Sequence, residues 1–158
     1  GKSVPGVAGG ICQVSTTVYN AVLRAGLEII ERHPHSQPVD YVPPGLDATV
    51  SEEAGLDLRF KNQLDVPVTL GVRMEGARLI AEVRAGLLML RNVEVTTEVL
   101  DVERPRLIGA VDKDAKVSGG KNGVRVAVWR SIDTCGTVSR ELISEDYYKP
   151  IHALAYDG

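Results

Sequence analysis

The chain has 158 residues, of which 44% are hydrophobic and 25% charged, and its formal net charge is −3. A chain of this size can bury one hydrophobic core, and an acidic balance without a basic cluster argues against a nucleic-acid partner or an anionic membrane surface. No signal peptide and no run of about 18 apolar residues occurs, so we expect no membrane span in this chain. The chain begins without a methionine and almost inside a motif, which is typical of a fragment or a processed piece.

The first predicted element is an amphipathic helix that follows a diglycine. Its hydrophobic residues recur at intervals of three and four, which is typical of one helical face. These residues are Ile11, Val14, Val18, Ala21, Val22 and Ala25. Gly26 stands where a left-handed C-terminal cap belongs, and Arg24 lies in the last turn. We therefore expect the helix to extend from about residue 11 to residue 25.

Cys12 lies at the start of this helix, where a thiol can be activated. Unpaired N–H groups at a helix N-terminus favour negative charge, so they could stabilise a thiolate or bind a developing oxyanion. Gly9 and Gly10 would let a substrate approach the backbone closely. Gln13 could donate to an oxyanion, or it could simply occupy the first turn of the helix. In the alternative interpretation the glycines form an ordinary turn and Cys12 is a small buried residue.

A strand carrying two histidines is predicted to follow the helix. Residues 27–35 are expected to be extended, because Pro34 disfavours a helical conformation for the residue before it. Residues 39–42 are predicted to form a second short strand, closed by a Pro-Pro-Gly turn. His33 and His35 are two positions apart, so they should project from the same face.

The histidine pair is compatible with a base site, half of a metal site or a solvated strand end. A metal ion would need a third ligand, for which the candidates are Asp40, Asp47 and Cys12. The chain lacks any standard zinc spacing, so we expect no metal. The Gly-Gly-Lys at residues 119–121 lacks the spacing and the following helix of a phosphate loop, and we expect a hairpin tip there and no cofactor.

A thiol mechanism needs an imidazole near Cys12 and a third group that orients it. A helix of about fifteen residues is roughly 22 Å long, and a returning strand of about seven residues at about 3.3 Å each matches it. Counting from Leu27, that strand reaches His33. Cys12 would then be the nucleophile, and Asp47 the carboxylate that orients the base. The base would be His33 or His35, and the alternative role of Asp47 is a turn residue bonded to nearby backbone.

From residue 56 the hydrophobic pattern changes to alternation, which predicts an antiparallel meander. Its strands are expected at residues 58–61, 66–74 and 77–84, and further strands at 93–102, 107–111, 124–132 and 138–144, with turns at 118–123 and 133–136. Cys135 lies in the last turn and should be exposed. We expect it and Cys12 to be two free thiols. Tyr147 and Tyr148 are predicted to dock on the sheet, although they could instead line a glycan-binding surface.

Four segments in fixed order resemble the VanW family. They are VPGVAGGICQVSTTVYNA at residues 4–21, GLEIIERHPHS at 26–36, YVPPGLDATV at 41–50 and LRFKN at 58–62. The resemblance extends to about residue 74, and Ala8 stands where the family has a third glycine. ISEDYYKP at residues 143–150 is similar to a tail that often follows this domain. The family takes its name from vancomycin-resistance gene clusters of Gram-positive bacteria. Since its activity is not established, the resemblance implies a cell-envelope setting more than a reaction.

The sequence therefore predicts an α+β fold. An N-terminal helix should pack on a mainly antiparallel sheet in a domain at residues 1–86, and a β-rich extension should follow at 87–158. The order of cysteine helix, strand, histidine and aspartate is also similar to the core of transglutaminase-like and papain-like enzymes, although those reach the histidine by a longer crossover.

Two classes of function remain open. In the first, which we favour, the chain is an extracytoplasmic or envelope module that binds or assists peptidoglycan or another envelope component. Binding would use the turn that contains Gly9, Gly10, Gln13 and Ser15, together with the histidine strand. In the second, it is a cysteine enzyme that transfers an acyl group or hydrolyses an amide in cell-wall peptide through a thioester on Cys12.

Overall fold

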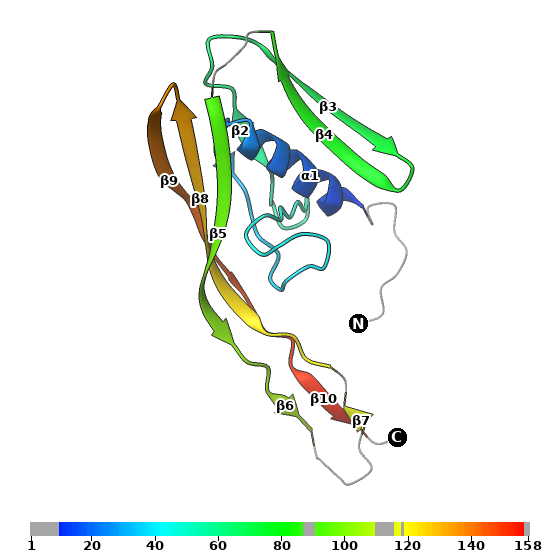
Figure 1. Cartoon of the computed structure of the whole chain (residues 1–158). Helices are drawn as coiled ribbons and strands as arrows, with labels where there is room; N and C mark the ends of the chain where they lie inside the picture. The colour runs from blue at the N-terminus through cyan, green and yellow to red at the C-terminus, as the bar shows by residue number, and fades with distance from the viewer. Residues whose placement is uncertain (1–9, 87–90, 110–115, 118, 157–158) are drawn as a thin grey trace.

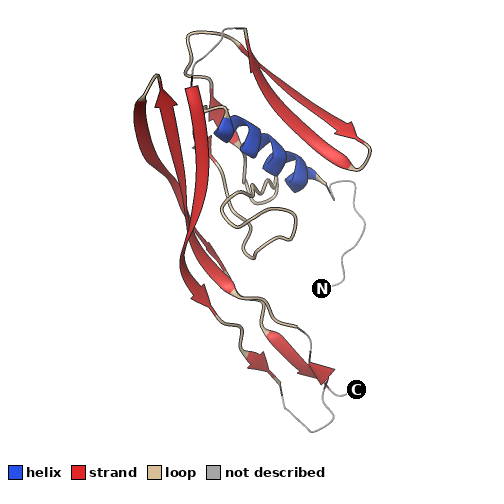
Figure 2. Ribbon diagram, viewed as in Figure 1, coloured by secondary structure: helices blue, strands red, loops and turns tan. Residues whose placement is uncertain are grey.

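The structure is a computed structural model that describes residues 10–86, 91–109, 116–117 and 119–156. Within these residues one helix, α1 (Ile11–Arg24), lies between a long three-stranded sheet and a two-stranded hairpin (Figure 1). Strands and loops make up the rest (Figure 2). This arrangement confirms the predicted α+β class, with one helix packed on antiparallel sheets.

The long sheet has the strand order β5–β8–β9 and is antiparallel throughout. Its strands are β5 (Arg91–Glu103), β8 (Gly123–Thr134) and β9 (Thr137–Tyr148). Ile143 is an extra residue in β9, because Leu142 pairs with Trp129 while Ser144 pairs with Val128. Such a bulge changes which side chains of a strand face the core.

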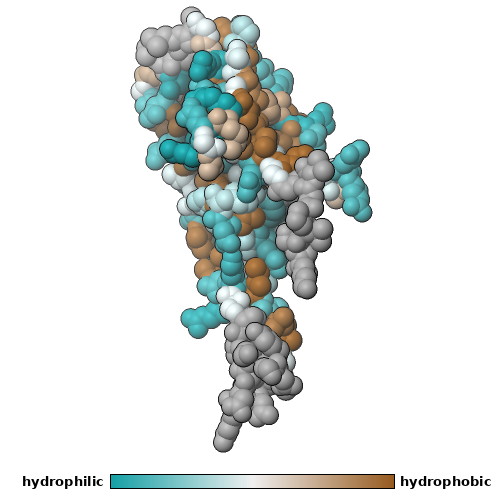
Figure 3. All heavy atoms as spheres, turned by 90° about the vertical axis from the view of Figure 1, so that its right-hand side faces the viewer, coloured by the Kyte–Doolittle hydropathy of each residue, from teal (hydrophilic) through white to brown (hydrophobic). Residues whose placement is uncertain are grey.

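Three smaller sheets complete the fold. Two are antiparallel pairs, β1 (Glu28–Glu31) with β2 (Arg59–Lys61) and β3 (Val68–Glu75) with β4 (Arg78–Ala85). The third lies beyond the lower end of the long sheet in Figure 1, where β10 (Ala153–Tyr156) pairs with β6 (Leu107–Ile108) and β7 (Lys116–Val117). The view of Figure 3, from the side of the β3–β4 hairpin, shows hydrophobic side chains among hydrophilic ones. On β3 the exposed hydrophobic residues are Leu70, Val72 and Met74.

The end of α1 agrees with the prediction from Gly26. Gly26 has φ +74°, a left-handed conformation that glycine adopts without a steric penalty. Its N–H donates to the carbonyl of Leu23, and the N–H of Leu27 donates to the carbonyl of Val22, each at 3.1 Å. This pair of bonds is a Schellman motif, so the helix ends where the sequence indicates.

The buried face of α1 differs from the predicted one. Ile11 and Val14 are 52% and 41% exposed. The buried residues of the helix are Ser15, Thr16, Tyr19, Val22 and Leu23. The prediction was wrong at the first turns because it considered hydrophobic residues only. The hydroxyls of Ser15 and Thr16 are buried because the loop against which they pack offers backbone hydrogen-bond partners.

Two strand predictions and one turn prediction also need correction. Residues 39–42 form no strand, and the prolines on both sides of them lack the N–H that a strand ladder needs. β2 pairs with β1 and not with β3, so the predicted meander begins one strand later. Residues 119–123 are not a hairpin tip, because β7 and β8 do not pair and Lys121 bridges to Ile151 instead. Ser118 and residues 110 and 111 lie outside the described residues.

The main hydrophobic cluster joins the helix, the loop after β1 and the long sheet. It consists of Tyr19, Leu23, Leu46, Ala48 and Val128. These residues come from both sides of residue 86. The domain division at residue 86 stays a prediction, but both parts contribute to one cluster.

The thiols and tyrosines of the sequence analysis can now be located. Cys12 and Cys135 are both free thiols, as predicted, and Cys135 is exposed at the turn between β8 and β9. Tyr148 is completely buried, whereas Tyr147 on the opposite face of β9 is 42% exposed. In the described part of the chain, no helix has the length and apolarity needed to cross a membrane.

Candidate functional site

The loop that carries Asp47 is fixed along α1 by hydrogen bonds on both sides of that residue. Ser15 Oγ donates to the carbonyl of Ala48 at 2.6 Å, and the N–H of Ala48 donates to Thr16 Oγ1 at 2.9 Å. Asn20 Nδ2 donates to the carbonyl of Leu46 at 2.6 Å. Because the neighbours of Asp47 are held by side chains of the helix, its own side chain has a defined position.

The Asp47 carboxylate is completely buried and receives four hydrogen bonds. Its Oδ2 accepts from the backbone N–H of His35 at 2.7 Å and contacts Nδ1 of the same histidine at 2.6 Å. Its Oδ1 accepts from Arg32 Nη2 at 2.9 Å and from the hydroxyl of Tyr148. A carboxylate has about four acceptor positions, so Asp47 is saturated.

These contacts determine the charge state of Asp47. Burial by itself would raise the pKa of this carboxyl, because it penalises the charged form. The hydrogen bonds from His35 and Tyr148 and the positive charge of Arg32 outweigh burial, so the pKa lies below its ordinary value. Asp47 is therefore an anion at neutral pH, and it is bound by groups that all prefer the anion.

Arg32 connects this aspartate to the long sheet. Its guanidinium also donates to Asp146 of β9 at 2.5 Å, and it lies over the ring of Tyr19 at 5.2 Å from the ring centre. The side chain of Arg32 is only 4% exposed. A buried cation placed between two buried carboxylates is a rigid element, since removal of the cation would leave two buried anions without their shared partner.

The two predicted histidines have different carboxylate partners. His35 is oriented by Asp47, as described above. His33 Nε2 lies 3.0 Å from the Glu31 carboxylate, and its carbonyl accepts from the N–H of Thr49 at 2.8 Å. The histidine that resembles an oriented base is thus His35, and the structure does not bring His33 to Asp47.

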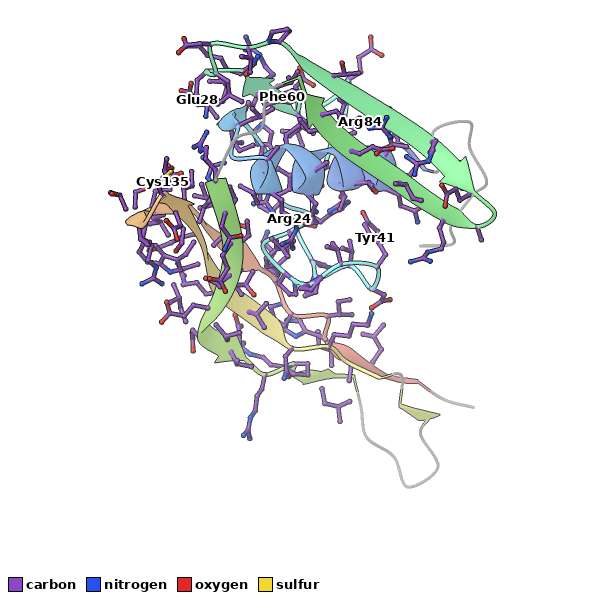
Figure 4. All side chains as sticks on the ribbon, turned by 45° about the horizontal axis from the view of Figure 1, so that its top comes forward. Arg24, Glu28, Tyr41, Phe60, Arg84 and Cys135 are labelled. Carbon is purple, nitrogen blue, oxygen red and sulfur yellow. The ribbon has the colours of Figure 1, made fainter. Side chains whose placement is uncertain are left out.

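Cys12 is half-buried, and its thiol donates to the carbonyl of Val50 at 3.7 Å. Within the described residues, no hydrogen bond joins this thiol to either histidine. Tyr41 lies beside His35, and the two rings meet edge to face at 6.4 Å. Burial raises the pKa of the Tyr41 hydroxyl, and the negative charge of Asp47 raises it further. Figure 4 shows Tyr41 on the loop after β1, extending toward α1.

The remaining predicted residues lie around the start of α1. Gly10 is the N-cap residue of α1, and no side-chain hydrogen bond caps the helix there. Gln13 is exposed. The Ser15 hydroxyl is already bonded to the loop backbone, and Gly9 lies outside the described residues. Asp40 pairs with Lys121 at 2.5 Å. Over the described ranges no group of three metal-ligating side chains occurs, so no set of donors there forms a metal site.

Sequence reasoning missed Arg32, Tyr41 and Asp146, and it predicted Tyr148 only as a residue that docks on the sheet. Arg32 stands beside the histidines, but an arginine in a strand is usually solvated. The pair formed by Asp146 and Tyr148 had one available signal, since both belong to the ISEDYYKP segment. Nothing in the sequence indicated that this segment packs against a loop about 100 residues earlier.

The sequence of this chain matches one family of proteins. A model described as VanW like protein matches residues 1–84, more than half of the chain, so the chain belongs to this family. Over 80 residues it is 51% identical to the uncharacterized protein YoaR of Bacillus subtilis, an alignment that covers 51% of this chain and 26% of that protein. Over 90 residues it is 31% identical to the vancomycin B-type resistance protein VanW of Enterococcus faecalis, covering 54% and 32%.

The comparisons also define how much of the site the family segment contains. The alignments span about a quarter and a third of the two relatives. No solved structure matches this chain. Asp146 and Tyr148 lie beyond residue 84, so two groups that bind Arg32 and Asp47 come from outside the matched segment.

Proposed function

We propose that this chain is an extracytoplasmic module of the cell envelope that binds peptidoglycan without transforming it. The observation that carries the proposal is the position of the Cys12 thiol, which donates to the Val50 carbonyl and to neither histidine. Asp47 and Arg32 are saturated by each other and by β9, which suits a rigid scaffold. The envelope setting is supported by the relative named for resistance to vancomycin, an antibiotic that acts on the cell wall.

The binding surface lies where Tyr41 and His35 meet the start of α1. Tyr41 is 45% exposed, and the His35 side chain is 22% exposed beside it. An exposed aromatic ring offers an apolar face to a sugar ring, and its hydroxyl offers a polar contact. Gln13 on the first turn of α1 is exposed and adds an amide that can donate and accept.

Sedimentation with purified peptidoglycan sacculi tests this surface. We expect the chain to co-sediment, and Tyr41→Ala to weaken the apparent affinity about tenfold, which corresponds to about 1.4 kcal/mol. Tyr147→Ala is the matched control, because Tyr147 is equally exposed but lies on the long sheet, bonded to Glu103. Sedimentation of Tyr41→Ala at the wild-type level, or no sedimentation of the wild-type chain, would contradict the proposal.

A second candidate function is acyl transfer, which the pairing of His35 with Asp47 favours. In that mechanism the Cys12 sulfur attacks an amide carbonyl carbon, and His35 accepts the thiol proton and returns it to the departing amine. A thioester on Cys12 results, and water or another amine then releases the acyl group. The mechanism requires the thiol to leave Val50 and approach the imidazole of His35.

Alkylation by iodoacetamide, read by peptide mass spectrometry, separates the two functions. For a binding module we expect Cys12 to be labelled more slowly than the exposed Cys135, with the same rate in His35→Ala. Faster labelling of Cys12 than of Cys135, lost in His35→Ala and kept in His33→Ala, would favour the enzyme. His33→Ala is the appropriate control because that histidine contacts Glu31 and not Asp47.

A further inference from the structure

A second site lies on the other side of Arg32, between the edges of two strands. A cleft of about 320 Å³ lies here. It is bounded on one side by β1 and the residue after it (28–32) and on the other side by residues 141–144 of β9. In the described part of the chain β1 pairs only with β2, and β9 only with β8. Consecutive residues border the cleft on both sides, whereas a strand face would contribute alternate residues. The cleft therefore runs along two strand edges without a strand partner, and of their backbone groups the N–H of Glu28 already donates to Gln63 Oε1 at 3.0 Å.

The floor of the cleft contains a polar atom without a partner. Tyr19 is completely buried, it lines the cleft, and its hydroxyl makes no hydrogen bond. Thr49 Oγ1 is the other such buried side-chain atom among the described residues. Burial raises the pKa of Tyr19 to about 12, so the hydroxyl keeps its proton and can donate it. An unsatisfied buried hydroxyl is costly, and a ligand oxygen at this position would remove that cost.

Two buried arginines fix the walls of the cleft. Arg32 lies over the Tyr19 ring and is neutralised by Asp47 and Asp146. Arg130 donates to the carbonyl of Leu27 at 2.6 Å and to Glu141 at 2.8 Å. Because both guanidiniums are already paired, they shape the site more than they attract an anion.

The rim of the cleft carries carboxylates. The side chains of Glu28 and Glu141 are 49% and 50% exposed, and that of Glu31 is 28% exposed. Figure 4 shows Glu28 at the end of the molecule near Phe60 of β2. Each of them already has a basic partner, so the rim does not select the charge of a ligand. Glu28 lies 3.8 Å from Lys61, Glu31 lies 3.0 Å from His33, and Glu141 lies 2.8 Å from Arg130.

We propose that this cleft binds a short protein segment in extended conformation, which adds a strand between the edges of β1 and β9 and gives a carbonyl oxygen to the Tyr19 hydroxyl. Main-chain pairing to an exposed strand edge is a common way to recognise peptides. β1 has four residues, and at about 3.3 Å per residue it can pair with a peptide of about four residues. The volume is at the lower limit of about 300 Å³ for ligand sites, which agrees with so short a segment. This inference does not depend on the surface around Tyr41.

Titration with the capped tetrapeptide acetyl-Val-Lys-Val-Thr-amide tests the cleft. Amide resonances of β1 and β9 in the full chain should shift saturably, and their hydrogen exchange should slow as new main-chain bonds form. Acetyl-Val-Glu-Val-Thr-amide should bind with similar affinity, because the rim carboxylates are already paired and the main chain of the peptide makes the contacts. The absence of saturable shifts at these two strands up to about 10 mM peptide, a concentration that would detect a free energy of only about 3 kcal/mol, would overturn the proposal.

Tyr19→Phe tests the role of the unpartnered hydroxyl. The variant should not lower the unfolding temperature, since it removes a hydroxyl that bonds to nothing in the unliganded protein. It should raise the Kd of the lysine peptide about three- to tenfold, the effect of one net hydrogen bond. Tyr147→Phe removes a hydroxyl from β9 outside the cleft and should leave the Kd unchanged. Equal affinity of Tyr19→Phe and the wild type would overturn the assigned contact.

Discussion

Asp47→Asn should lower the free energy of unfolding by about 3 to 5 kcal/mol, the usual effect of breaking a buried ion pair. The amide removes one of the two anions that neutralise Arg32. The amide nitrogen also takes the place either of Oδ2, which accepts from the His35 N–H, or of Oδ1, which accepts from the Tyr148 hydroxyl, so at least one buried donor loses its acceptor. Urea unfolding at pH 7 measures the effect. Asp65→Asn, at an exposed aspartate, is the control and should change stability by less than about 0.5 kcal/mol.

The same substitution should have a pH dependence of defined sign. The pKa of Asp47 is lower in the folded state than the ordinary value of about 3.9 in an unfolded chain. The contribution of Asp47 to stability is therefore complete above its pKa in the unfolded chain, and it is lost as the pH falls through its lower pKa in the folded chain. The stability gap between wild type and Asp47→Asn should narrow below about pH 4. A gap under 1 kcal/mol at pH 7 would show that the network is not a stabilising element.

Gly45→Ala should lower the free energy of unfolding by about 2 to 5 kcal/mol, the sum of left-handed backbone strain and core overpacking. Gly45 has φ +92°, and a Cβ built there would lie 2.6 Å from Val128 Cγ2 and 3.2 Å from Val126 Cγ2. Neither valine can withdraw easily, because both are buried in the long sheet. The N–H of Gly45 also donates to the Tyr148 hydroxyl at 2.7 Å, so any shift of the loop disturbs the Asp47 network.

Gly55→Ala separates the two causes of that loss. Gly55 also has a left-handed conformation, with φ +64°, but a Cβ there would meet nothing within 4 Å. Its substitution should therefore lose only the backbone contribution of about 1 to 2 kcal/mol. Urea unfolding of both variants gives the steric contribution by difference. Equal losses in the two variants would mean that the long sheet yields to the added methyl group.

Local signals in the sequence were enough for the helix end and for the β3–β4 hairpin. Gly26 identified the helix cap because the left-handed conformation is a property of that residue itself. The alternation over residues 66–74 and 77–84 identified the hairpin, because two strands joined by so short a turn pair with each other. The pairing of β2 with β1 could not be foreseen, since it joins strands that are separated by a long irregular loop.

The candidate site was accessible to sequence reasoning only in part. Asp47 was predicted to orient a histidine, and it contacts His35. That either residue has a catalytic role stays a prediction, because Cys12 contacts Val50 instead. The buried Arg32 could not be identified, since its partner Asp146 lies 114 residues away in a strand whose facing depends on one extra residue.

The bulge at Ile143 determines which side chains of β9 face the core. It lies where the network of Asp47 and Arg32 adjoins the cleft between β1 and β9. Partners in an antiparallel pair share a face, so Glu141 lies on the face of the buried Arg130, and Asp146 lies on the face of the buried Val126. The side chains of a regular strand alternate between its two faces. The odd-numbered Glu141 and the even-numbered Asp146 can therefore lie on the same face only because an extra residue lies between them. If β9 kept all its residues but continued in the register of the β8–β9 hairpin without the bulge, Glu145 and Tyr147 would pair with Val126 and Val124 in place of Asp146 and Tyr148. Arg32 and Asp47 would then face the wrong side chains, although the sequence of the strand had not changed.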